Sequence, residues 1–123
     1  TYIYIHRLVK ARGYDAKIIN GIPSFCAVSA RLEDSLADRS EQIHIIPSTY
    51  GVEDALNLSG TKVLMKAASK MPLVKEALKR SNTTCSMIEN CGMPDEHIYH
   101  CIDEIPDQAS YYSIIVVKEE PHD

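Results

Sequence analysis

Apolar positions along the chain follow two different spacings, and these alternate from one end to the other. Apolar residues three and four positions apart predict helices, whereas short β-branched runs between turn residues predict strands. The helical spacing covers residues 2–12, 24–32, 52–58 and 72–79. The strand pattern covers residues 17–19, 42–46, 62–65, 84–89 and 111–117, with an extended segment around 97–101. This alternation predicts an α/β domain with a mixed, mostly parallel β-sheet flanked by helices.

The segment from Ala16 to Leu32 is expected to contain a strand-to-helix junction, which is the strongest indication of a binding site in the sequence. Its apolar run at residues 17–19 predicts a buried strand, the pair Asn20-Gly21 predicts a turn, and Ser24 is placed to cap the next helix. A helix N-terminus at the carboxyl edge of a sheet presents free backbone N–H groups to a crevice where ligands commonly bind. Glycine turns are common, so an ordinary strand-to-helix connection is the alternative.

The two ends of the chain differ from the middle. Residues 2–12 place Ile5, Leu8 and Val9 on one face of an amphipathic helix, which Gly13 ends. The chain begins without Met and without a signal peptide, so we expect it to start within a longer protein. At the other end, residues 119–123 are expected to form a charged tail beyond the α/β domain.

The amino-acid composition argues against nucleic-acid, membrane and metal partners. The 123 residues are 45% hydrophobic and 24% charged, which is typical of a globular domain. A net charge of -4, with acidic and basic residues interspersed, argues against a nucleic-acid-binding surface. No apolar run approaches the roughly 20 residues that span a bilayer. The spacing of the four cysteines fits neither a zinc motif nor a disulfide framework, so we expect reduced thiols in a cytoplasmic protein without a metal.

The sequence contains none of the motifs that mark common catalytic sites. It has no serine flanked by the glycines of a nucleophile elbow, no HExxH pair and no glycine-rich phosphate loop. A protein without such groups must act by positioning and desolvating reactive partners. Group transfer from an activated donor, such as a sulfonium, meets that condition.

Four segments in chain order, NGIPSF, VLMK, ENCGMPDEHI and YYSIIVV, resemble the C-terminal half of the tetrapyrrole methylases. Within that family the chain is most similar to the precorrin-2 C20-methyltransferase group of cobalamin biosynthesis. The resemblance implies a homodimeric, two-domain enzyme that uses S-adenosylmethionine and acts on precorrin-2 or cobalt-precorrin-2. Such enzymes have about twice this length, so residues 1–14 would be the end of an N-terminal domain or a linker helix, and 15–118 the C-terminal domain. Without the rest, this chain alone is expected to be inactive.

The resemblance also implies donor-binding positions. They lie after the expected turn, at the ends of two expected strands and at the start of the last strand, and they are Pro23, Ser24, Met65, Cys91, Tyr112 and Ser113. Met65 could equally fill the core, because methionine packs well in irregular interiors. Other readings stay open: a methylase of the same fold acting on another ring carbon, a diphthine-synthase-like enzyme, or a non-catalytic binding or oligomerisation module.

Overall fold

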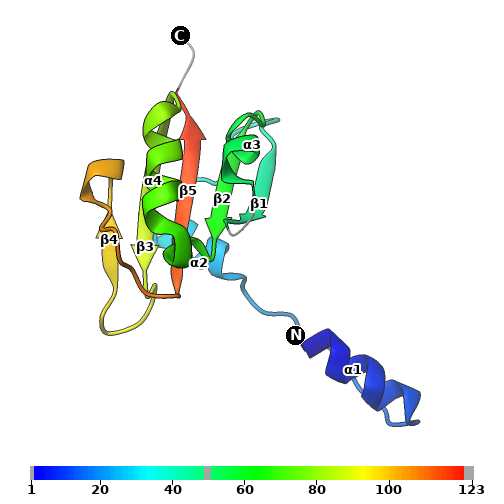
Figure 1. Ribbon diagram of the computed structural model, residues 1–123. Coiled ribbons are helices and arrows are strands. Elements are labelled where there is room, and N and C mark those ends of the chain that lie inside the picture. The colour runs from blue at the N-terminus through cyan, green and yellow to red at the C-terminus, as the bar shows by residue number, and fades with distance from the viewer. Residues whose placement is uncertain (1, 49–50, 121–123) are drawn as a thin grey trace.

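The computed structural model describes residues 2–48 and 51–120, in which five strands form one sheet with helices on both faces (Figure 1). The strand order is β1-β2-β5-β3-β4. The elements are α1 (Tyr2–Ala11), α2 (Ser24–Leu32), β1 (Ile43–Pro47), α3 (Val52–Leu56), β2 (Thr61–Met65), the 3₁₀ turn η1 (Ala67–Lys70), α4 (Met71–Arg80), β3 (Thr83–Glu89), β4 (His97–Tyr99), the 3₁₀ turn η2 (Ile102–Glu104) and β5 (Ser113–Glu119).

The α/β class and the mixed sheet are confirmed, but the strand directions differ from the expectation of a mostly parallel sheet. Among the strands of the described residues, only β1 and β2 pair in parallel, across the α3 crossover. β5 enters the middle of the sheet and runs antiparallel to both of its neighbours, and β3 and β4 form an antiparallel pair. Hydrophobic spacing reports which face a side chain occupies and carries no information on strand direction, so the sequence could not reveal this.

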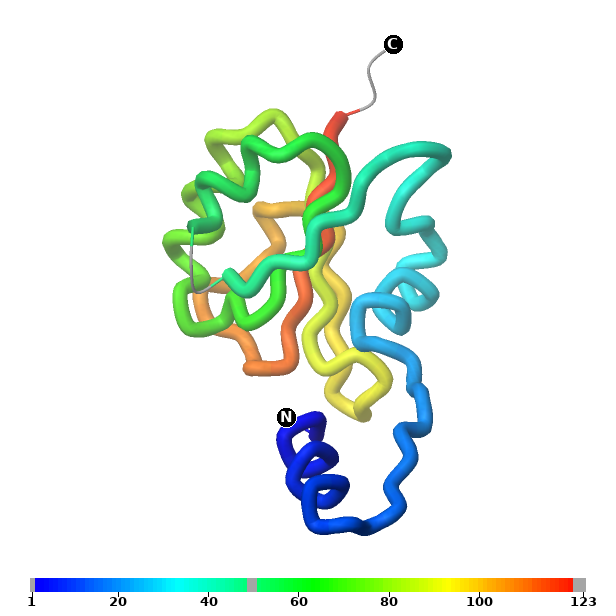
Figure 2. Tube along the Cα trace, turned by 90° about the vertical axis from the view of Figure 1, so that its right-hand side faces the viewer, coloured from blue at the N-terminus to red at the C-terminus, as the bar shows by residue number. Residues whose placement is uncertain are grey.

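Two apolar clusters hold the layers together, one on each face of the sheet. β5 contributes to both, because successive side chains of a strand point to opposite faces. Ile115 and Val117 pack with α4, whereas Ile114 and Val116 pack with Val28 of α2. Figure 2 shows the sheet from the side, with the green helices α3 and α4 on one face and the blue α2 on the other.

The strand expected at residues 17–19 is absent, and this prediction was wrong. Residues 14–23 are extended without a ladder partner, and the Ile19 side chain is 91% exposed. A strand needs a neighbour for its backbone groups, and none of the five strands in the described residues pairs with this segment. Ser24 is also not the cap: Pro23 occupies the N-cap position of α2 and makes no side-chain hydrogen bond there.

The remaining elements lie close to their expected positions. The helix expected at 52–58 ends earlier, at Leu56, and the last strand begins later, at Ser113. β5 continues to Glu119, so the first residue of the expected tail belongs to the sheet, while residues 121–123 lie outside the described part. α1 forms as expected but lies apart from the sheet, at the end of the extended linker (Figure 1).

Candidate functional site

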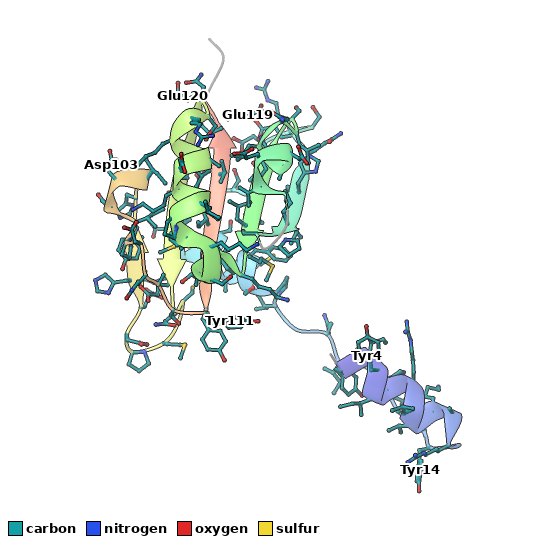
Figure 3. The ribbon with its side chains drawn as sticks, viewed as in Figure 1. Tyr4, Tyr14, Asp103, Tyr111, Glu119 and Glu120 are labelled. Carbon is teal, nitrogen blue, oxygen red and sulfur yellow. The ribbon has the colours of Figure 1, made fainter. Side chains whose placement is uncertain are left out.

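A pocket of about 220 Å³ opens at one end of the sheet, where β2 and β3 end and β5 begins. Figure 3 shows Tyr111 at this end and Glu119 and Glu120 at the opposite end. We call it the strand-end pocket, and its lining residues are Ser24, Val28, Met65, Lys66, Ile88, Cys91, Met93, Tyr111, Tyr112, Ser113 and Ile114. It lies on the α2 face of the sheet, since Val28, Ile88 and Ile114 belong to the apolar cluster on that face.

Five of the six residues expected from the sequence line this one pocket, although they come from four separate segments. They are Ser24, Met65, Cys91, Tyr112 and Ser113. Pro23 does not line the pocket and precedes α2 at its N-cap position. The convergence follows from the topology: β5 runs against β2 and β3, so its first residues meet their last ones.

Met65 lies between the α2-side apolar cluster and the strand-end pocket. Its side chain is only partly buried and packs against the α2-side cluster, while it also lines the pocket. Its carbonyl accepts a 2.7 Å hydrogen bond from the Ser48 amide, which fixes the end of β2. Lys66 follows in a left-handed conformation with φ of 60° and places a cationic residue in the pocket wall.

The loop after β3 supplies Cys91 and Met93. Its Glu96 carboxylate accepts 2.7 Å hydrogen bonds from the Gly92 amide and from Arg31 Nε of α2. These donors, the Gly92 amide first and then Arg31, hold the pKa of Glu96 below its usual value. Burial, together with the nearby Glu96 charge, raises the pKa of the Cys91 thiol. Cys91 is therefore a neutral thiol in the pocket wall rather than a reactive thiolate.

The segment before β5 forms the other side of the pocket. The rings of Tyr111 and Tyr112 meet edge to face at 5.4 Å, and both are largely exposed at the mouth. Ser113 is buried, and its hydroxyl donates a 2.6 Å hydrogen bond to the Ser110 carbonyl. That hydroxyl thus stabilises the turn, so a ligand contact from Ser113 would come mainly from its backbone.

Several residues that line the strand-end pocket were not predicted from the sequence. Lys66, Met93 and Tyr111 lie within or beside the segments that carried the resemblance, so their neighbourhood was the available signal. Ile114 also lies within such a segment, whereas Val28 and Ile88 follow only from the packing of α2 on the sheet. The pocket wall is mostly apolar, with thioether and aromatic groups, and no lining residue described here has a carboxylate or an imidazole.

Such a wall suits a flat or apolar group better than a metal ion. Within residues 2–48 and 51–120 there is no group of three or more His, Cys, Asp or Glu side chains that could hold a metal. Apolar walls with a few polar backbone groups are typical of cofactor sites. The same described residues include no helix long and apolar enough to cross a membrane.

Comparison with known sequences gives the family. The sequence model of the tetrapyrrole (corrin/porphyrin) methylases matches residues 1–104. A protein of Methanocaldococcus jannaschii, named a probable cobalt-precorrin-2 C(20)-methyltransferase, is 26% identical over 121 residues. That match covers 96% of this chain and 53% of the relative, so the chain spans about half the length of the curated relative it matches.

Solved structures of similar fold include two methyltransferases. A cobalt-precorrin-4 methyltransferase of cobalamin biosynthesis superposes with a TM-score of 0.76 at 17% identity, covering 94% of this chain and 57% of that one. The uroporphyrin-III C-methyltransferase of Thermus thermophilus, complexed with S-adenosyl homocysteine, gives 0.67 at 13% identity, covering 93% and 57%. These likenesses establish the fold, and the sequence match over most of the chain establishes the family. The chain belongs to the tetrapyrrole (corrin/porphyrin) methylases.

Proposed function

We propose that this chain is the C-terminal half of an S-adenosylmethionine-dependent methyltransferase that methylates C20 of precorrin-2 or cobalt-precorrin-2. The observation that carries the proposal is the meeting of Ser24, Met65, Cys91, Tyr112 and Ser113 in the strand-end pocket. The family match and the name of the Methanocaldococcus jannaschii relative support the reaction and the substrate. The four free cysteines fit a reducing compartment, and we place the enzyme in the cytoplasm.

The residues present fit such a donor. Met65 and Met93 offer apolar contact to a flat heterocycle, and the backbone at Cys91 offers polar groups at its edge. S-adenosylmethionine supplies an electrophilic methyl group on a sulfonium. The wall contributes binding, orientation and exclusion of water, because its residues include no carboxylate or imidazole that could move a proton. Its thiol, Cys91, stays protonated near neutral pH.

The N-terminal segment supports a two-domain enzyme. α1 has no buried residue, and the linker exposes apolar side chains at Ile18, Ile19 and Ile22. Exposed apolar surface of this extent marks an interaction site. We propose that residues 1–14 belong to the other half of the enzyme, that this half supplies the second wall of the donor site, and that the enzyme is a homodimer.

Calorimetry with S-adenosylhomocysteine tests the donor site. We expect binding by the full natural chain that contains this sequence, and weak or no binding by residues 1–123 alone. In the full chain, Met65→Ala should weaken binding by about 1–2 kcal/mol, the scale of one partly buried side-chain contact. Met65→Leu, which keeps the volume, and Leu58→Ala, at an exposed position outside the pocket, are the controls. An unchanged dissociation constant for Met65→Ala would remove this residue from the site.

The methylated product tests the reaction. We expect the full chain to transfer one methyl group to C20 of the reduced macrocycle, and residues 1–123 alone to be inactive. Mass spectrometry gives the number of methyl groups and NMR gives the carbon. A methyl group on another ring carbon, or on a modified histidine, would assign the chain to a different methylase of this fold. Transfer to no acceptor by a chain that also fails to bind the donor would indicate a non-catalytic module.

A further inference from the structure

Asn90 occupies an unusual position at the edge of the strand-end pocket. It directly follows β3 and is 7% exposed, with a left-handed φ of 53°. Asparagine tolerates this conformation better than most residues that carry a side chain. Its backbone joins both loops of the pocket: the Asn90 amide donates to the Tyr112 carbonyl at 2.8 Å, and its carbonyl accepts from the Met93 amide at 2.9 Å.

The Asn90 side chain repeats this connection. Its Nδ2 donates to Asp95 Oδ2 at 3.0 Å, and its Oδ1 accepts from Ser110 Oγ at 2.8 Å. A carboxylate can only accept, which orients the Asn90 amide group with its nitrogen toward Asp95. One buried carboxamide therefore links the end of the 91–95 loop to the segment before β5.

Ser110 uses all of its polar groups in the same network. Its amide donates to Glu89 Oε1 at 2.8 Å and its carbonyl accepts from the Ser113 hydroxyl. Its own hydroxyl, besides donating to Asn90, accepts a 3.3 Å bond from the Tyr112 amide. A polar network with its groups satisfied makes a local structure rigid and specific.

We propose that the pair Asn90 and Ser110, the Asn90–Ser110 bridge, positions the two loops of the strand-end pocket relative to each other. The bridge sets the spacing between Cys91 and Met93 on one loop and Tyr111 and Tyr112 on the other. Both are positioning residues, since neither lines the pocket itself. The consequence for ligand binding rests on the proposed donor site, whereas the coupling of the loops does not.

Amide hydrogen exchange in the ligand-free full chain tests the coupling. Asn90→Gly keeps the left-handed backbone accessible and removes only the carboxamide, and Ser110→Ala removes the hydroxyl. We expect the amides of Gly92 and Met93, whose own acceptors both variants keep, to exchange about tenfold faster in both, because opening of the loops becomes easier. Asn57→Gly and Ser35→Ala, which make the same changes outside the pocket, should leave these amides unaffected. Exchange unchanged in the two bridge variants overturns the proposal.

A charge swap distinguishes the bridge from general loosening of the loop. Asn90→Asp alone places a second carboxylate against Asp95, and neither carboxylate can donate a hydrogen bond to the other. We therefore expect the same loop amides to exchange faster in this variant. The double variant Asn90→Asp, Asp95→Asn exchanges donor and acceptor and should restore protection to within about twofold of the wild type. Failure of the double variant to recover any protection contradicts a role for this hydrogen bond.

Binding of S-adenosylhomocysteine by the same proteins tests the consequence. We expect Asn90→Gly and Ser110→Ala to raise the dissociation constant about tenfold, with recovery in the double variant. Faster exchange with an unchanged dissociation constant would show that the bridge does not position donor-binding groups. If the wild-type full chain binds no S-adenosylhomocysteine, the proposed function fails, while the exchange rates still decide whether the bridge couples the loops.

Discussion

The N-terminal segment, residues 2–22, and the sheet unit, residues 24–119, contain similar apolar residues and use them in opposite ways. In the sheet unit, Leu64 of β2 and Ile115 of β5 face each other across the ladder with no exposed surface. In the N-terminal segment, α1 buries no residue, and Leu8 is 62% exposed. The hydrophobic effect therefore stabilises the sheet unit, whereas the apolar side chains of the N-terminal segment stay in contact with solvent.

An amphipathic sequence pattern indicates a helix and its apolar face but not the surface that this face packs against. The pattern in residues 2–12 correctly predicts a helix and an apolar face. It says nothing about where the covering surface lies. A ten-residue helix is marginal in water without tertiary packing. The exposed face of α1 is consistent with the proposal that it binds the rest of a longer protein.

The sharpest test of this contrast is one substitution made in both regions. Leu64→Ala should lower the free energy of unfolding by about 2–5 kcal/mol, because it leaves a cavity in a close-packed cluster. Leu8→Ala should change it by less than about 0.5 kcal/mol, as is usual for exposed positions. Urea unfolding of residues 1–123, followed by circular dichroism, measures both. Equal losses would show that α1 already packs on the sheet unit.

Glycines offer a second pair of matched changes. Gly60 has φ of 97°, and a Cβ at this position would lie 2.3 Å from the Gln42 carbonyl oxygen, which accepts a hydrogen bond from the Thr61 amide. We expect Gly60→Ala to cost about 3 kcal/mol, from backbone strain and the clash together. Gly13 has a similar φ of 85° with no atom near its Cβ position, so Gly13→Ala carries the strain alone. Thermal unfolding should show a larger loss for Gly60→Ala than for Gly13→Ala; similar unfolding temperatures for the two variants would contradict the steric argument.

Much of the sheet unit could be predicted because its pattern and its packing agree. The apolar run in β5 fits a central strand, and Pro72 fits the first turn of α4. The strand expected at residues 17–19 failed for the opposite reason. Ile18 and Ile19 have strand-forming side chains, but no neighbouring strand receives their backbone. Local preference cannot supply a hydrogen-bonding partner.

The segments that form the candidate site could be predicted from the sequence, but the way the fold brings them together could not. Met65 and Cys91 could be identified from family resemblance, and the fold places both in one pocket. β5 runs antiparallel to its neighbours and so brings Tyr112 beside them. No periodic pattern in the sequence indicates the direction of a strand. The bridge between Asn90 and Ser110 joins residues 20 positions apart through side chains, so no local pattern could reveal it.

Acid titration should reveal a small contact specific to the sheet unit. Lys118 Nζ of β5 donates a 2.8 Å hydrogen bond to Asp34, just after α2, and this lowers the pKa of Asp34 below 3.8. The folded protein thus binds this proton less readily than the unfolded chain, so the contribution is full above about pH 4 and is lost as the pH falls further. Because the Asp34 side chain is 60% exposed, we expect only about 0.5 kcal/mol. Unfolding curves of wild type and Asp34→Asn should differ at pH 6 and converge near pH 2; a constant difference would contradict the assignment.

Removal of residues 1–22 should change the free energy of unfolding least, although it deletes the most residues. Its described residues, 2–22, contribute no buried side chain to either apolar cluster, so the sheet unit should unfold with nearly the same free energy without the segment, within about 0.5 kcal/mol. Urea unfolding of the two chains at equal concentration measures the difference. In the full natural chain, where α1 is proposed to pack against the other half, Leu8→Ala should cost about 1.5–3 kcal/mol, the scale of a fully buried leucine side chain. A full chain that tolerates Leu8→Ala as well as residues 1–123 do would leave the apolar face of α1 uncovered and would contradict its assignment to the other half.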